Sequence, residues 1–171
     1  MSVNVSGLDL SMTGTGIAFT SAGDFVLTTL IKTNPKHGDA RLVQIRQQIM
    51  ELVSGSAYAL IEAPTPRSFS SAITGMVQGV AREALIELGV PYGTVLPATL
   101  KKYATGKGTG DKTAMALEAY KRAGVEFEDD NQCDAWWLWH MGRDHMGDPV
   151  LSLPSLNRQS LTKIEPGWLG R

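Results

Sequence analysis

Three carboxylates occupy positions where a folded chain seldom leaves a charge. Asp9 stands between two leucines in a stretch that should form a central strand, and Glu62 follows the apolar run 57–61. Asp134 lies a full turn inside an expected helix, on the face that should pack inward. A buried charge is costly unless it is paired or binds a cation. The pattern indicates that Asp9 is the first ligand of a metal site whose other ligands the chain must supply. The alternative is that Asp9 caps the turn after its strand through Ser11 and Thr13.

The start of the last expected helix adds further acidic residues. Asp130 shares a helix face with Asp134, and this face also carries Trp137, Leu138 and Met141. Glu126, Glu128 and Asp129 suit a helix N-terminus for dipole reasons alone. Oxygen ligands without histidine or thiolate favour Mg²⁺ or Mn²⁺ over zinc. Two such ions about 4 Å apart can activate water and stabilise the leaving oxygen in a phosphodiester displacement.

A basic segment covers residues 97–112, which we expect to be a flexible loop in its first part. It contains three glycines and four lysines against one aspartate; the lysines are Lys101, Lys102, Lys107 and Lys112. Such a segment suits a phosphate-bearing partner. It is not a nucleotide P-loop, because the Gly-Lys-Ser/Thr order after a four-residue spacer is missing. A solvated basic loop without a partner is the alternative.

Hydrophobic periodicity predicts the elements that must position these residues. Strands are expected at 3–10, 17–19, 25–31, 57–61 and 92–96, and helices at 38–54, 68–89, 111–123 and 129–146. The first two strands should form a hairpin, and a right-handed crossover should place the fourth strand parallel to the first. The order predicts an α/β fold with a mixed five-stranded sheet, three antiparallel strands followed by parallel ones, flanked by helices.

Two of the expected helices have sides whose partners are undetermined. In the helix at 68–89, Ile73, Met76, Val77, Val80, Ala84, Leu85 and Leu88 line an apolar side. Ser71, Gly75 and Gly79 form a smooth second side, which either accommodates the domain's own sheet or is a subunit interface. Glycine inside a helix costs roughly 1 kcal/mol against alanine and needs a reason. In the helix at 129–146, Trp136 and Trp139 should point away from the inward face, where the C-terminal tail is their candidate cover.

The composition is that of one globular domain. The chain has 171 residues, a net charge of −1 and a single cysteine, which permits no internal disulfide and fits a reducing compartment. No apolar run is as long as a membrane span, and the N-terminus has no signal pattern. These features predict a cytoplasmic protein with a domain at 1–147 and an extended C-terminal tail at 148–171.

In the residues described above, the chain resembles the RuvC family of Holliday-junction resolvases, within the ribonuclease H-like superfamily. Its small size and divergence suggest the phage or prophage branch. The resemblance covers residues 3 to about 140. It rests on the order and spacing of Gly7-Leu8-Asp9-Leu10-Ser11, Thr13-Gly14-Thr15-Gly16, Ile61-Glu62, Leu100-Lys101, Thr105-Gly106-Lys107-Gly108, Lys112 and Asp134-Ala135.

The resemblance implies a homodimeric, two-metal-ion endonuclease of DNA recombination and repair that cleaves branched DNA. By this resemblance, Asp9, Glu62 and Asp134 are ligands for Mg²⁺, with Mn²⁺ as a substitute. The resemblance also implies DNA contacts at Lys101, Lys107 and Lys112, and we add Lys102 as a further candidate DNA contact. The family usually has a further acidic residue or histidine three positions from the last aspartate. Here Asn131 stands three positions before Asp134 and Asp130 one further, and both could reach the site; we expect Asp130.

A second departure concerns the aromatic wedge that bacterial members carry soon after the glutamate. This chain has Pro64-Thr65-Pro66-Arg67-Ser68-Phe69 there. Phe69 is the candidate wedge at a different spacing, and Arg67 is a further candidate DNA contact.

Two other functions compete with a nuclease. Actin-like ATPases and sugar kinases use a similar opening hairpin for Mg-ATP, but they need two such domains and usually more than twice this length. A structure-specific DNA-binding protein with a vestigial acidic cluster would keep the lysines. The joint presence of Asp9, Glu62 and Asp134 argues against that alternative.

Overall fold

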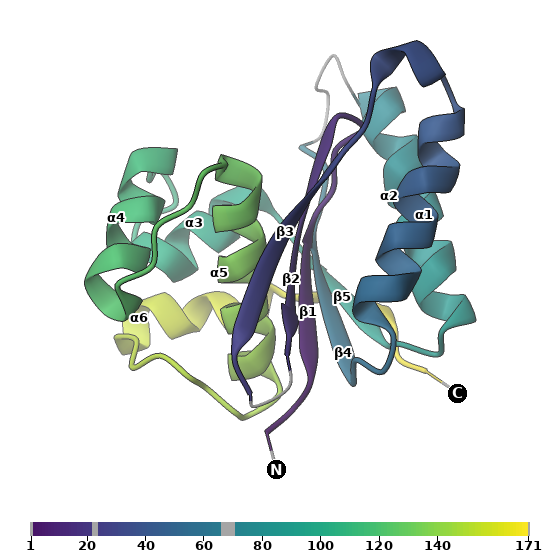
Figure 1. Cartoon of the computed structure of the whole chain (residues 1–171). Coiled ribbons are helices and arrows are strands. Elements are labelled where there is room, and N and C mark those ends of the chain that lie inside the picture. Colours follow the sequence, from purple (N-terminus) through teal and green to yellow (C-terminus); the bar gives the residue numbers. More distant parts are fainter. Residues whose placement is uncertain (1, 22–23, 66–70, 171) are drawn as a thin grey trace.

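The structure of the chain is a computed structural model that describes residues 2–21, 24–65 and 71–170 (Figure 1). Its centre is a six-stranded sheet in the order β3-β2-β1-β4-β5-β6. The strands are β1 (Val5–Asp9), β2 (Gly14–Thr20), β3 (Val26–Lys32), β4 (Tyr58–Glu62), β5 (Tyr92–Val95) and β6 (Glu165–Trp168). The first three form an antiparallel meander, and β4 lies parallel to β1. The predicted mixed sheet is confirmed, and the tail adds β6, a strand that the periodicity did not reveal.

Helices cover both faces of the sheet (Figure 1). One face carries α1 (Ala40–Val53) and α2 (Ser71–Glu87). The other carries α5 (Asp130–His145), which packs on the sheet and is backed by α3 (Pro97–Thr105), α4 (Lys112–Ala123) and α6 (Ser155–Arg158). Two short 3₁₀ helices, η1 (Pro35–His37) and η2 (Gln159–Lys163), complete the described elements. None of the described helices combines the length and apolarity needed to cross a membrane.

The strand alternation of period two divides the core into one cluster on each face. Val5 of β1 and Leu60 of β4 pack among the side chains of α5, whereas Leu8 and Ile61 pack among those of α1 and α2. Successive side chains of a strand point to opposite faces. The alternation therefore directs the last residue of β1 and the last residue of β4 to the α5 face.

Trp136 and Trp139 are both buried, but the prediction that Trp139 points away from the sheet, toward the tail, is wrong, because its indole contacts β2. Both indoles are as buried as Trp137, because the sheet covers one side of α5 while α3, α4 and the tail cover the other. Trp136 packs edge-on against Phe127, with ring centroids 5.8 Å apart. The indole N–H of Trp139 donates to the Thr20 hydroxyl at 3.1 Å. From Ala135 to Asp144 the helix is thus enclosed on all sides.

The expectation of a flexible loop over the first part of the basic segment is also wrong, because residues 97–105 form α3. Pro97 occupies the first turn of the helix, where its missing N–H costs nothing. Leu100 and Tyr103 are buried on one side of the helix. Gly106 ends it with a φ of 80° and donates its N–H to the Lys102 carbonyl. Only residues 106–111 connect α3 to α4, which begins at Lys112.

The smooth side of α2 is a free surface of the described chain. A Cβ added at Gly75 or Gly79 would find no described atom within 4 Å outside the neighbouring backbone of α2, so the explanation that these glycines accommodate the domain's own sheet is wrong. Ile73 and Met76, expected on the apolar side, are 51% and 41% exposed. The subunit-interface explanation stays a prediction.

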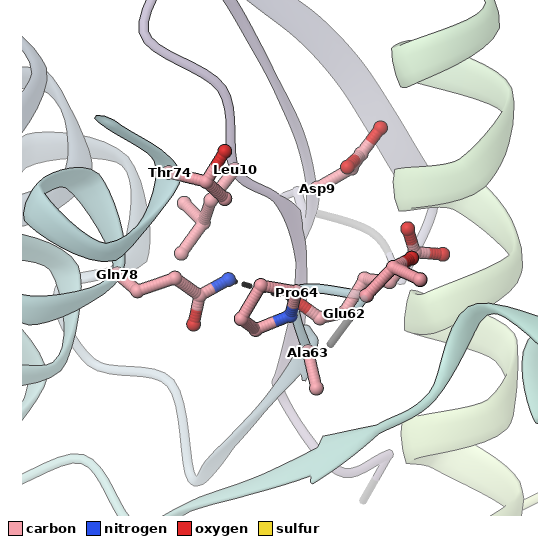
Figure 2. Close-up of a pocket in the computed structure, with 8 residues that line it drawn as sticks. Asp9, Leu10, Glu62, Ala63, Pro64, Thr74 and Gln78 are labelled. Atoms are coloured by element: carbon pink, nitrogen blue, oxygen red, sulfur yellow. Dashed lines mark hydrogen bonds between the residues drawn. The ribbon is translucent and has the colours of Figure 1, made fainter. Parts of the chain in front are cut away.

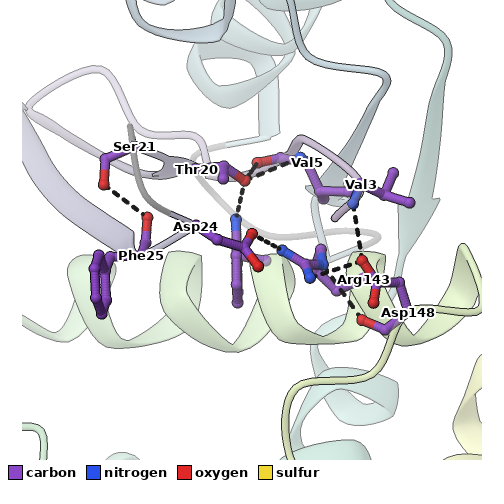
Figure 3. Close-up of polar contacts among 9 residues, drawn as sticks. Val3, Val5, Thr20, Ser21, Asp24, Phe25, Arg143 and Asp148 are labelled. Carbon is purple, nitrogen blue, oxygen red and sulfur yellow. Dashed lines mark hydrogen bonds and ion pairs between the residues drawn. The ribbon is translucent and has the colours of Figure 1, made fainter. Parts of the chain in front are cut away.

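A buried arginine near the end of α5 makes polar contacts with segments next to the sheet (Figure 3). Arg143 is 2% exposed and pairs with Asp24 at 2.9 Å and with Asp148 at 2.7 Å. Asp148 also accepts the backbone N–H of Val3 at 2.8 Å. This network joins the chain before β1, the turn before β3 and the end of α5, so the register of α5 on the sheet is determined at this end.

Candidate active site

Two adjacent strands end in carboxylates that face the same helix. Asp9 is the last residue of β1 and Glu62 the last of β4, and the parallel register pairs Leu8 with Ile61 immediately before them. Figure 2 shows both carboxylates directed toward α5. Beside them lies a cavity of about 210 Å³, whose lining includes Thr74 and Gln78 of α2. The Gln78 amide donates to the Glu62 carbonyl at 2.8 Å and so holds the end of β4.

Two glycines let α5 approach the first two strands closely enough to bring Asp134 to this end. A Cβ on Gly7 would collide with the Ala135 carbonyl, and a Cβ on Gly16 would collide with the Asn131 carbonyl. The Asn131 side chain donates to the Gly14 carbonyl at 2.8 Å. The first turns of α5 therefore lie directly on the backbone of β1 and β2, on either side of Asp134.

The three carboxylates share one electrostatic environment. Burial raises the pKa of Asp9 to about 7, with the charge of Asp134 as the next cause. Burial, then Asp9 and Asp134, raise the pKa of Glu62 to about 8. Burial also raises the pKa of Asp134 to about 6, against the opposing charge of Lys112. Each carboxyl group thus loses solvation on folding, and Glu62 in particular is repelled by both of the others.

No described residue compensates these carboxylates with a hydrogen bond. The turn after β1 is held by other groups, since the Thr15 hydroxyl donates to the Ser11 carbonyl at 2.7 Å and the Ser11 hydroxyl accepts from the Thr13 and Gly14 N–H groups. Asp9 takes no part in these bonds, so its alternative role as a turn cap is not observed in the described contacts. The side chains of Glu62 and Asp134 likewise accept no hydrogen bond from the described part of the chain.

The fit of a divalent ion to these residues rests on the chemistry of the donors. Carboxylate oxygens are the ligands that Mg²⁺ and Mn²⁺ prefer, and buried carboxylates that repel one another are the groups such an ion would stabilise. In residues 2–21, 24–65 and 71–170, no three His, Cys, Asp or Glu side chains are already gathered into a metal-holding cluster. The donor set therefore fits a hard cation, and binding would require the side chains to converge.

The candidates for a fourth ligand have other partners in this structure. Asp130 is 59% exposed and pairs with Lys112 at 2.9 Å. Asn131 is held by Gly14 through its side-chain nitrogen. Asp129, expected only to suit the helix N-terminus, does cap α5 by accepting the Asn131 N–H, and its charge also raises the pKa of Asp9 and Asp134. Asp130 stays the predicted fourth member.

The basic segment contributes two lysines to the site and two to its surroundings. Lys112, the first residue of α4, opposes the raised pKa of all three carboxyl groups, and Lys101 of α3 does so for Glu62 and Asp134. Lys102 lines a separate cavity between α3 and the C-terminal tail. Lys107 is exposed in the connection between α3 and α4. Arg67 and Phe69 lie outside the described residues.

The sheet order, the crossover from β1 to β4 and the placement of α5 define a ribonuclease H-like fold. The chain is similar in structure to RuvC of Thermus thermophilus, with a TM-score of 0.74 and 17% identity over 96% of this chain and 100% of that one. The similarity to T. thermophilus RuvC in complex with a Holliday junction substrate has the same TM-score, with 20% identity over 96% and 99% of the two chains. No protein-family model and no curated protein matches the sequence. At this identity the similarity establishes the fold.

Proposed function

We propose that the protein is a divalent-metal-dependent endonuclease that cleaves branched DNA and resolves Holliday junctions by paired phosphodiester hydrolysis. The observation that carries this proposal is that Asp9, Glu62 and Asp134, at the ends of β1 and β4 and on α5, accept no hydrogen bond from the described residues, while the charge of Asp134 raises the pKa of both Asp9 and Glu62. The similarity of fold to a RuvC solved with a Holliday junction supports the choice of substrate. The small size and divergence of the chain favour the phage or prophage branch of these enzymes.

In this proposal Asp9, Glu62 and Asp134 hold two Mg²⁺ ions, with Asp130 as the fourth ligand and Mn²⁺ as a substitute. When bound, the ions lower the pKa of a water molecule and stabilise the leaving oxygen. Asp9 and Glu62 are positioned by strand ends, whereas Asp134 is positioned by the close packing of α5 on Gly7 and Gly16. Lys112 and Lys101 reduce the repulsion among the carboxylates and, in this proposal, also attract the phosphate to be cleaved.

A cleavage assay on a synthetic four-way junction, a Y-fork and a linear duplex, each with Mg²⁺ and with EDTA, tests the proposal. We expect cleavage of the junction in Mg²⁺ and none in EDTA. Binding of the junction without product in Mg²⁺ or Mn²⁺ would instead support the structure-specific DNA-binding protein. A rise in melting temperature with Mg-ATP, without cleavage of any DNA, would support the ATP-binding alternative.

The exposed smooth side of α2 leads to a prediction about assembly. Resolving a junction requires cuts in two opposed strands, and a two-fold dimer presents two equivalent sites. We expect a dimer that packs through the surface around Gly75 and Gly79, where no described side chain intervenes. Gly79→Arg should give a monomer by light scattering at tens of micromolar and replace paired incision with single nicks.

Ala123→Arg, at the exposed end of α4, is the matched control and should remain dimeric. A wild-type protein that is monomeric at these concentrations and still makes paired cuts would contradict the dimer.

The lysines of the basic segment should determine the affinity for DNA more than the rate of cleavage. Lysine acts on phosphate as a point charge, and each phosphate contact contributes about 0.9 to the slope of log K against log salt on duplex DNA. Lys107→Ala and Lys112→Ala should therefore weaken junction binding and reduce that slope. At saturating enzyme both should still cleave far better than Asp9→Asn. If Lys112→Ala binds normally and cannot cut, the proximity of Lys112 to the carboxylates is catalytic and this division of roles is wrong.

A further inference from the structure

The C-terminal tail returns to the sheet and is anchored on both sides of Lys163. Before it, the Arg158 guanidinium pairs at 2.6 Å with Asp144, whose side chain is fully buried, and the Asn157 amide donates to the Tyr103 carbonyl at 2.8 Å. After it, β6 pairs antiparallel with β5, with Glu165 opposite Thr94. The tail expected to be an extended wrap thus holds Lys163, the last residue of η2, in a defined place.

A groove runs between this part of the tail and the start of α3. Its main cavity has a volume of about 720 Å³ and is lined by residues that include Leu96, Thr99, Lys102 and Lys163. A second cavity shares Leu96, Thr99 and Lys163 and reaches Ala63, the neighbour of Glu62. Ala63 also lines the cavity beside Asp9 and Glu62. We call these cavities together the tail groove; through their shared lining residues they connect the surroundings of the carboxylates with the start of α3, Lys102 and Lys163.

A third cavity shares Leu96 with the two cavities of the tail groove. This third cavity is lined by Thr65, Pro97 and Lys101, among others, and Thr65 again belongs to the cavity beside the carboxylates. Lysines therefore line several cavities around the α3 N-terminus. Because these cavities adjoin the one beside the carboxylates through shared residues, they suit a chain-like ligand better than a single small anion.

The charges along the tail groove select a polyanion. Lys101, Lys102 and Lys163 form no ion pair within 4 Å with any residue that the structure describes. Glu165 is the one acidic side chain among the described residues that line these cavities beyond the carboxylate site. Thr99 and Thr162 add hydroxyl groups to the lining. Lysines with free ammonium groups, interspersed with hydroxyls and small apolar side chains, match a sugar–phosphate backbone.

We propose that the tail groove holds the backbone of the DNA strand that extends from the carboxylate site, and that Lys163 of the C-terminal tail contacts one of its phosphates. This inference rests on the proposed function and adds to it a part of the chain that the basic segment does not include. Lys163 is not among the residues that line the cavity beside Asp9 and Glu62, so its proposed role is in binding and not in the hydrolytic step.

Binding of a four-way junction in EDTA across a salt series tests the contact without relying on cleavage. Lys163→Ala should reduce the magnitude of the salt slope by about 0.9, or about 0.7 if the strand in the groove is single. The matched control is Lys121→Ala, which removes the same charge from the last turn of α4, where Lys121 pairs with Glu118 at 3.2 Å. This control and Lys163→Arg should keep the wild-type slope. Equal melting temperatures of Lys163→Ala and the wild type would show that the tail stays docked.

A series of junctions, each with one neutral methylphosphonate at a successive position from the cleaved phosphate, locates the contact. At one or two adjacent positions the methylphosphonate and Lys163→Ala should be non-additive, because each removes the same interaction. Additivity at every position, or a wild-type salt slope in Lys163→Ala, would overturn the inference and leave the proposed function intact. A wild type that binds the junction no better than linear duplex would overturn the proposed function and, with it, this inference.

Discussion

Asp9→Asn should reduce junction cleavage by about 10³-fold or more while the protein stays folded. Asparagine keeps the size of the side chain and removes the negative charge that would bind the ion. Metal ions contribute several kcal/mol to stabilisation of the transition state, and each 1.36 kcal/mol corresponds to a factor of ten in rate. Single-turnover cleavage at saturating enzyme measures the effect apart from DNA affinity, and Asp134→Asn should behave alike.

The control for this prediction is Asp39→Asn. Asp39 is exposed before α1 and makes no side-chain capping bond, so the same chemical change there should leave cleavage at the wild-type rate. Unchanged circular dichroism would show that both variants fold. Wild-type turnover by Asp9→Asn in Mg²⁺ would remove Asp9 from the metal site.

The positions of Asp9 and Glu62 were predictable because strand alternation and the right-handed crossover are general rules that apply without knowledge of the other contacts. The apolar residues around each carboxylate identify a buried strand, and the crossover then places β4 beside β1. The approach of Asp134 depends on Gly7 and Gly16, whose role as contact points for α5 appears only when the helix lies on them. Sequence therefore indicated which residues belong together, while the contact that joins them is tertiary.

Other features were missed because their stabilising contacts come from distant parts of the chain. The glycines and lysines of residues 97–112 suggested a loop, but burial of Leu100 and Tyr103 stabilises α3 there. The strand β6 contains Pro166 and Gly167, which disfavour a strand, and it exists because β5 offers a free edge. The Gly167 backbone lies against the Tyr92 ring, a close approach that tolerates no Cβ.

The pH dependence of stability should reveal the carboxylates even without DNA. The pKa values of about 7 for Asp9, 8 for Glu62 and 6 for Asp134 lie above the ordinary values of 3.8 and 4.5. Between about pH 5 and pH 8 the folded state therefore holds more protons than the unfolded state, so the free energy of unfolding falls as pH rises. In EDTA the melting temperature should decline across this range.

A divalent ion should reverse this decline, because it binds the deprotonated carboxylates that destabilise the metal-free fold. Melting temperatures in EDTA and in saturating Mn²⁺ from pH 5 to pH 9 measure both effects. The gain from Mn²⁺ should grow as pH rises from about 6 to 8, as protons cease to compete for the site.

Asp9→Asn should melt several degrees above the wild type in EDTA at pH 8, since about 1 kcal/mol shifts a domain of this size by 2–4 °C. It should gain little from Mn²⁺ at any pH. A Mn²⁺ effect that is equal at pH 5 and pH 8, or equal in Asp9→Asn and the wild type, would show that the ion binds elsewhere.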